Sequence, residues 1–142
     1  MSEQSNTRVG SFRVLAGENL TSKEGYLVTM THDTGVAEVK LPAAITDITP
    51  YVVGEGGADT ALVTVIPLIA ERNVRIVLKG TCNPGDQLVL AAIAGSDAGM
   101  VRVLPAGAGT YRVIAIAEEK GVDGQLVLTR PCMVGNVTIS GT

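Results

Sequence analysis

Residues 73–92 read NVRIVLKGTCNPGDQLVLAA. Val74, Ile76 and Leu78 occupy every second position, and in a strand this spacing places side chains on one face of a sheet. Residues 80–86 break the alternation before it resumes. The Asn-Pro-Gly-Asp sequence in this break supplies the fixed φ of proline and the permissive φ of glycine that a tight reversal needs. The stretch therefore predicts a β-hairpin in mid-chain.

The same pattern, a glycine-containing turn followed by a short β-branched run, recurs on both sides of this stretch. A second hairpin is predicted around His32-Asp33-Thr34-Gly35, and residues 42–50 form a turn or a single helical turn. Pro131 is expected to end the last strong strand. The other predicted strands are Phe12–Leu15, Tyr26–Thr31, Val36–Leu41, Tyr51–Val53, Ala61–Ile66, Met100–Leu104, Thr110–Ala117, Gln125–Thr129 and, as an edge strand, Val137–Ile139.

The predicted fold class is all-β, a compact β-barrel or sandwich of short antiparallel strands with an extended N-terminal arm. The arm is residues 1–11, which are polar and have no periodicity. Residues 12–142 are expected to form one β-barrel-like domain, because 142 residues suit a single domain with a sizeable core. Aromatic residues make up only 3% of the chain, so aliphatic residues must fill that core.

The two halves of the chain resemble each other. The run that ends at Pro67 is similar to the run that ends at Pro131, and the prolines are 131 − 67 = 64 positions apart. Leu27 and Leu88 lie in a second similar pair of segments, 88 − 27 = 61 positions apart. Simple β-sequences often look alike, so the sequence leaves open whether this likeness is a duplication. A duplication would imply two similar β-units that share one core.

The composition argues against several classes of function. The net charge is −3 and the arginines are scattered, whereas nucleic-acid binding needs clustered cations or stacked aromatic rings. No run of about 18 apolar residues predicts a membrane helix, and no basic and apolar leader precedes the polar start. We therefore expect a protein made in the cytoplasm, with Cys82 and Cys132 as reduced thiols.

Residues that could carry chemistry are few. The single histidine, His32, lies in a predicted turn, and one histidine with two distant cysteines does not make a common zinc site. Gly54-Glu55-Gly56-Gly57 lacks the Lys-Ser/Thr of a phosphate loop and is read as a hairpin turn. Most aspartates lie in turns, where they cap the backbone, although calcium in one such loop stays an alternative. Glu118-Glu119-Lys120 is read as a solvated loop. We expect no catalytic residue, cofactor or metal.

The order of several segments resembles the bacteriophage capsid decoration (cement) proteins. The segments are Arg13–Leu20 with Gly25–Val28, then Asn83–Val89, Tyr111–Glu118 and Gly124–Leu128. The resemblance implies a small β-barrel protein without catalytic residues, which assembles as a homotrimer on the outer surface of a capsid and clamps neighbouring major capsid subunits. The arm would gain order on a partner by adding a strand to an exposed sheet edge. The candidate partner-binding residues are Ser5, Asn6, Thr7, Arg8, Val9 and Phe12.

A ligand- or glycan-binding β-module of a phage tail or surface adhesin is the alternative. Glycan sites usually offer aromatic faces, and the chain has three tyrosines and one phenylalanine to supply them.

Overall fold

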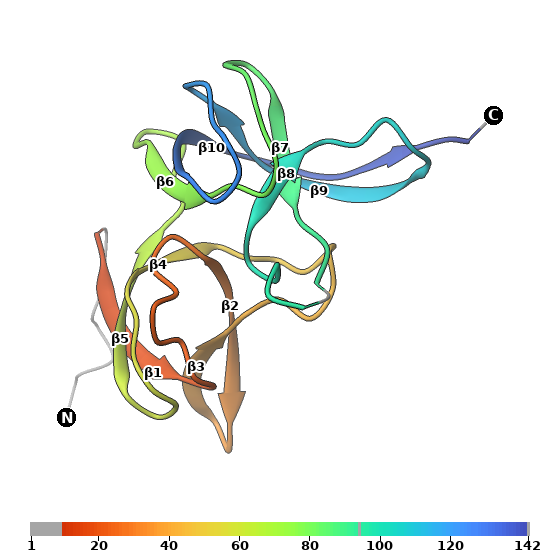
Figure 1. Ribbon diagram of the computed structural model, residues 1–142. Coiled ribbons are helices and arrows are strands. Elements are labelled where there is room, and N and C mark those ends of the chain that lie inside the picture. Colours follow the sequence, from red (N-terminus) through yellow and green to blue (C-terminus); the bar gives the residue numbers. More distant parts are fainter. Residues whose placement is uncertain (1–9, 94, 142) are drawn as a thin grey trace.

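A computed structural model of the chain describes residues 10–93 and 95–141, and these residues form strands, turns and loops without a helix. The predicted all-β class is therefore confirmed (Figure 1). The ten strands are β1 (Phe12–Ala16), β2 (Leu27–Asp33), β3 (Val36–Lys40), β4 (Tyr51–Glu55), β5 (Leu62–Pro67), β6 (Val74–Val77), β7 (Gln87–Leu90), β8 (Val101–Val103), β9 (Gly109–Ala117) and β10 (Leu126–Ile139).

Strands β1 to β5, which we call the first unit, form a closed barrel in the order β1-β3-β2-β4-β5. The barrel closes because β5 pairs with β1, with Phe12 opposite Val65. Four of the five pairings are antiparallel, as predicted, but β1 and β3 run parallel with Leu15 opposite Glu38. The predicted reversal after His32 is the β2–β3 hairpin. Closure leaves the barrel with few unpaired strand edges.

Strands β6 to β10, the second unit, form a five-stranded sheet in the order β6-β10-β9-β7-β8 (Figure 1, upper part). A single parallel bridge between Leu78 and Val101 joins the two ends of this order. The backbone N–H of Lys79 donates to the carbonyl of Val101 at 2.7 Å, as the N–H of Gly17 donates to the carbonyl of Val39 at 2.8 Å in the first unit. The second unit thus repeats the connectivity of the first.

The repeat extends to the register of the strands. Phe12 pairs with Val65 in the first unit, and Val74 pairs with Thr129 in the second. Val74 lies 74 − 12 = 62 positions after Phe12, and Thr129 lies 129 − 65 = 64 positions after Val65. Tyr51 pairs with Pro67 in the first unit, and Ala115 pairs with Pro131 in the second. Both residues of the second pair lie 64 positions later in the chain than their counterparts (115 − 51 and 131 − 67). The similarity between the two halves of the sequence is therefore a similarity of structure.

The predicted mid-chain hairpin is wrong, although both of its strands exist. Strands β6 and β7 do not pair, because β10 and β9 lie between them in the sheet. The loop between β6 and β7 instead crosses the loop that joins β9 to β10. Cys82 forms a bridge with Gly121, and the N–H of Gly80 donates to the carboxylate of Asp123 at 2.8 Å. Contacts with a distant loop thus override the local turn signal.

Pro131 does not end a strand as predicted. It lies inside β10, a 14-residue strand whose register with β9 shifts between Pro131 and Gly135. A bulge tolerates proline because the ladder is already interrupted there. The predicted edge strand Val137–Ile139 is the continuation of β10 along β9. Residues 42–50 are a turn without a helix, and the Asp47 carboxylate accepts from the N–H of Ala43 at 2.8 Å.

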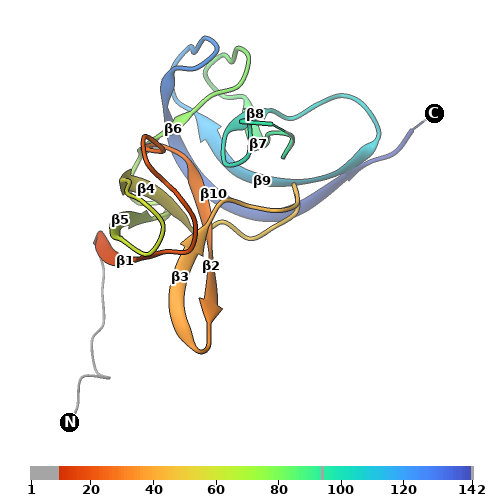
Figure 2. The same cartoon turned by 60° about the horizontal axis from the view of Figure 1, so that its bottom comes forward.

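Two projections extend beyond the repeated scaffold (Figure 2). In the first unit, β2 pairs with β4 only at Leu27 and Val28, so the β2–β3 hairpin continues past the barrel. In the second unit, β6 pairs with β10 only over residues 126–129, and β7 pairs with β9 no further than Val113. Residues 136–139 of β10 and residues 109–112 of β9 therefore continue as a two-stranded ribbon toward the C-terminus.

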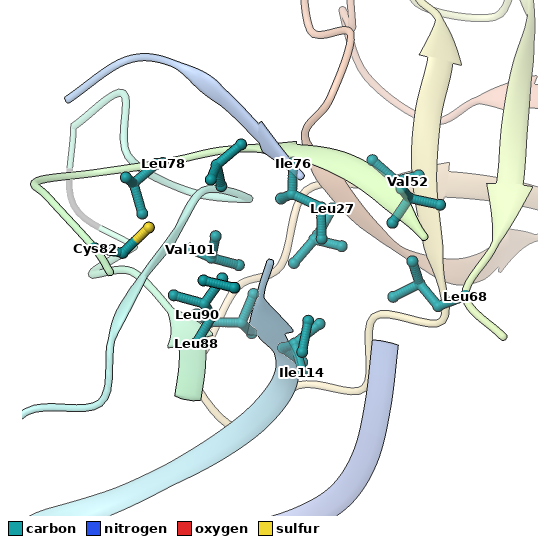
Figure 3. Packing of buried hydrophobic residues seen from close by; sticks show 14 residues of the cluster. Leu27, Val52, Leu68, Ile76, Leu78, Cys82, Leu88, Leu90, Val101 and Ile114 are labelled. Carbon is teal, nitrogen blue, oxygen red and sulfur yellow. The ribbon is translucent and has the colours of Figure 1, made fainter. Parts of the chain in front are cut away.

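The core is aliphatic, as the composition predicts, and has two main clusters. One cluster fills the barrel and contains only residues of the first unit, among them Val14, Val39 and Val63. The larger cluster fills the second unit and includes residues that precede β6. Figure 3 shows three of these, Leu27, Val52 and Leu68, beside Ile76, Leu78, Leu88, Leu90, Val101 and Ile114. The second cluster therefore fastens the two units together. The division into an arm and one domain stays a prediction.

Candidate partner-binding surfaces

Phe12 is the one predicted partner-binding residue within the described part of the chain; Ser5, Asn6, Thr7, Arg8 and Val9 lie outside the described residues. Phe12 begins β1 and packs partly buried against the barrel core. Its ring meets the ring of Tyr51 edge to face, with the ring centroids 5.4 Å apart. This geometry gives Phe12 a structural role at the barrel wall.

The β2–β3 hairpin is the first projecting surface. Its turn places Thr34 at φ 49° and Gly35 at φ 86°, the left-handed conformations of a two-residue hairpin loop. The N–H of Gly35 donates to Nδ1 of His32 at 3.2 Å, but His32 itself lies in β2 opposite Ala37 and not in the turn that the sequence predicts for it. The histidine therefore shapes the tip of the hairpin.

Apolar side chains are exposed on this hairpin. Met30 and Val36 are 36% and 51% exposed, although both lie in regular strands. A shallow hollow of about 440 Å³ opens on it, lined by Met30, Thr31, His32, Gly35 and Ala37. Exposed apolar groups on a projecting element are typical of contact surfaces. The sequence shows only alternation here, and it does not reveal that no element of the described residues covers this hairpin.

The β9–β10 ribbon is the second projecting surface. One face is apolar: Tyr111, Val113, Val137 and Ile139 form a cluster with Val89, Leu104 and Ile45. The other face is polar, and the hydroxyls of Thr110 and Thr138 lie 3.1 Å apart across the ribbon. Within residues 10–93 and 95–141, no strand pairs with β10 at residues 135–139 on the side away from β9. This strand edge can accept a further strand.

A groove of about 560 Å³ separates β4 and β5 of the first unit from the start of β6. The residues that line it are Ser11, Val52, Val53, Gly54, Glu55, Thr64, Ile66, Arg72, Asn73, Val74 and Arg75. Its lining combines apolar side chains with charged groups of both signs. Sequence reasoning missed this groove because it is formed by residues that come together only when the two units pack.

Glu119 and Glu118 form ion pairs with the strands beneath them, so the prediction of a simply solvated loop needs correction. A carboxylate oxygen of Glu119 lies 2.7 Å from Nη1 of Arg75, and Glu118 lies 3.0 Å from Nε of Arg130. The N–H of Leu128 also donates to Glu119 at 3.0 Å. This hydrogen bond, followed by the contact with Arg75, lowers the pKa of Glu119. The charges of this loop thus fix its position on β6 and β10.

Groups suited to chemistry do not gather in the described part of the chain. Within it, no three His, Cys, Asp or Glu residues lie close enough to hold a metal ion. Cys82 and Cys132 are unpaired thiols, and burial raises the pKa of both. No membrane-spanning helix is found in the described residues.

No family model matches the chain, and no curated protein matches its sequence. A solved structure does match: the crystal structure of the N base of the head fiber gp8.5 in bacteriophage phi29. The two share 21% sequence identity, with a TM-score of 0.63 over 92% of this chain and 98% of that chain. At this identity the match establishes the fold. The chain has, over nearly its whole length, the fold of the phi29 head fiber base.

Proposed function

We propose that this chain is a structural component of a phage virion, which binds the outer surface of the capsid and cements neighbouring major capsid subunits. The observation that carries the proposal is the fold shared with a phage head fiber base over 92% of the chain. A partial match could reflect a common β-module, whereas this one includes both units and their arrangement. The protein is made in the host cytoplasm and acts without enzymatic activity.

The projections supply the surfaces that such a protein needs. The two units repeat one scaffold, so the elements that exceed the scaffold are those that the fold alone does not require. The β2–β3 hairpin combines exposed Met30 and Val36 with a shallow hollow. We assign the main capsid contact to this hairpin and a supporting contact to residues 5–9 of the arm. Three copies form a homotrimer, so that each trimer binds the capsid at three points.

A comparison of two valines tests the hairpin. Val36 is 51% exposed on the hairpin, and Val122 is 57% exposed in the loop before β10, so a charge at either position is solvated in the free protein. If Val36 lies in the capsid contact, Val36→Asp places a charge in a desolvated interface. We expect it to weaken binding to capsids stripped of this protein by roughly tenfold or more, equivalent to about 1.4 kcal/mol.

Val122→Asp is the matched control and should bind like the unmodified protein. Cosedimentation with stripped capsids measures both variants. Equal binding by the two variants would remove the hairpin from the contact. Failure of the unmodified protein to bind any capsid would contradict the function itself.

The alternative, a glycan-binding module, finds less support. Sugar sites commonly stack the ligand on aromatic rings, and none of the residues that line the 560 Å³ groove is aromatic.

A further inference from the structure

The groove between the units has the form of a slot for an extended peptide. Apolar Val52, Ile66 and Val74 are among the residues that line it, and Gly54 adds no side chain. A Cβ at Gly54 would contact the Ile66 side chain at 3.4 Å, so a side chain here would rise from the surface between β4 and β5. A segment of main chain can therefore approach the surface of β4 and β5 closely.

One wall of the groove is the edge of β6 away from β10, which the described residues occupy only from Val77 onward. Strand β6 is the first strand in the order of its sheet and pairs with β10 on one side. On its other side, the N–H of Val77 donates to the carbonyl of Gly25 at 2.9 Å. Hydrogen-bonding directions alternate along a strand, so the N–H and carbonyl of Arg75 point to that same side. Arg75 lines the groove, which places these groups where an added strand would pair with them.

The chain itself enters at this groove. Ser11 is one of the lining residues, and Gly10 before it is exposed, with no atom within 4 Å of where a Cβ would be. A glycine in open space permits a reversal of the backbone. The nine preceding residues can span up to about 30 Å when extended. Their attachment beside the groove gives them a high effective concentration there.

The charges of the segment match those of the groove. Glu55 is exposed, lines the groove and forms no ion pair with the described residues. Arg8 lies only three positions before Ser11, so its side chain can reach Glu55. Glu3 lies further along the segment, and Arg72 lies on the β6 side of the groove. We propose that residues 1–9 of the same chain lie in this groove as a strand along the outer edge of β6, with Arg8 against Glu55. Capsid binding by the arm would then require its release from this site.

Amide hydrogen exchange at Arg75 tests the strand directly. If residues 1–9 pair with β6, the Arg75 amide should exchange at least about tenfold faster after their deletion. Ile76 pairs with β10 and supplies an internal control for intact folding. Equal exchange at Arg75 with and without the segment, while Ile76 stays protected, would overturn the proposal.

A charge exchange tests the register of the segment. A labelled peptide of residues 1–10 should bind the truncated protein, and Glu55→Arg in the protein or Arg8→Glu in the peptide should each weaken binding. The two changes together should restore it. Glu55 is exposed, so its substitution leaves the fold intact. Absence of peptide binding, or no restoration, would contradict the proposed site, and protection at Arg75 that depends on protein concentration would assign the segment to a neighbouring copy. None of these measurements involves a capsid, so the proposed function is tested separately.

Discussion

Leu126 of the second unit lies against Gly25 of the first. Gly25 has φ +85°, and a Cβ at this position would collide with the Leu126 side chain and lie 3.0 Å from Cγ2 of Val77. Gly85 is the equivalent glycine of the second unit: the N–H of Gly25 donates to Val53 at 2.8 Å, and the N–H of Gly85 donates to Ala117 at the same distance. Gly85 has φ +91° and no atom within 4 Å of a Cβ. The two glycines differ in one respect, the contact between the units.

This difference predicts unequal effects of the same substitution. Gly85→Ala should lower the free energy of unfolding by about 1–2 kcal/mol, because alanine is strained in the left-handed conformation. Gly25→Ala should lower it by about 1–3 kcal/mol more, because the added methyl group overpacks the junction with Leu126. Urea unfolding of both variants measures the difference. Equal losses would show that the units do not pack at Gly25 as described.

The two thiols should differ in reactivity. Cys82 is 3% exposed and its Sγ lies 3.7 Å from the carbonyl of Glu119, whereas Cys132 is less buried. Burial raises the pKa of both, so little thiolate forms near pH 8. A thiol reagent should label Cys132 first and Cys82 only on unfolding, with two thiols in the unfolded protein before any reduction. Cys132→Ser should abolish the native reaction. A disulfide in freshly purified protein would contradict this prediction.

Stability should fall in acid through Glu119. Its folded pKa is lowered below the ordinary value of 4.5, so its contribution is complete above that pH and is lost as the pH falls through the folded pKa. The Glu119→Gln variant keeps a group that can accept from Leu128 but loses the charge that pairs with Arg75. The unmodified protein should be more stable at pH 7, and its advantage should shrink below pH 4.5. An advantage that is constant from pH 7 to pH 3 would remove Glu119 from this role.

The proposed homotrimer makes a prediction about mass. Light scattering after size-exclusion chromatography should give three times the chain mass of 14.6 kDa, or a monomer that forms trimers only on the capsid. Particle images distinguish these two outcomes. Isolated single copies on the particle would contradict the trimer.

The sequence predicted local structure well where neighbours in sequence are also neighbours in space. The β2–β3 hairpin follows from alternation and from a two-residue turn that ends in Gly35. The mid-chain hairpin failed because β6 pairs with β10, from much later in the chain, and β7 pairs with β9 and β8. The turn residues were real, but Gly85 donates to Ala117 instead of reversing the chain onto β6.

Spacing carried more information than composition. The separation of 64 between Pro67 and Pro131 identifies equivalent positions in β5 and β10. The separation of 61 between Leu27 and Leu88 is wrong by one position, because Leu88 pairs with Ala115, the equivalent of Tyr51, and Tyr51 pairs with Val28. The binding surfaces could not be found in this way. The groove needs both units in place, and Val36 is exposed because no strand among the described residues covers it.

Electron microscopy of the parent virion tests the proposed capsid-binding role most directly. We expect density for this fold on the outer capsid surface, in groups of three, with the β2–β3 hairpin against the major capsid subunits. Density for this fold inside the capsid or in the tail, or no such density on the particle, would contradict this role.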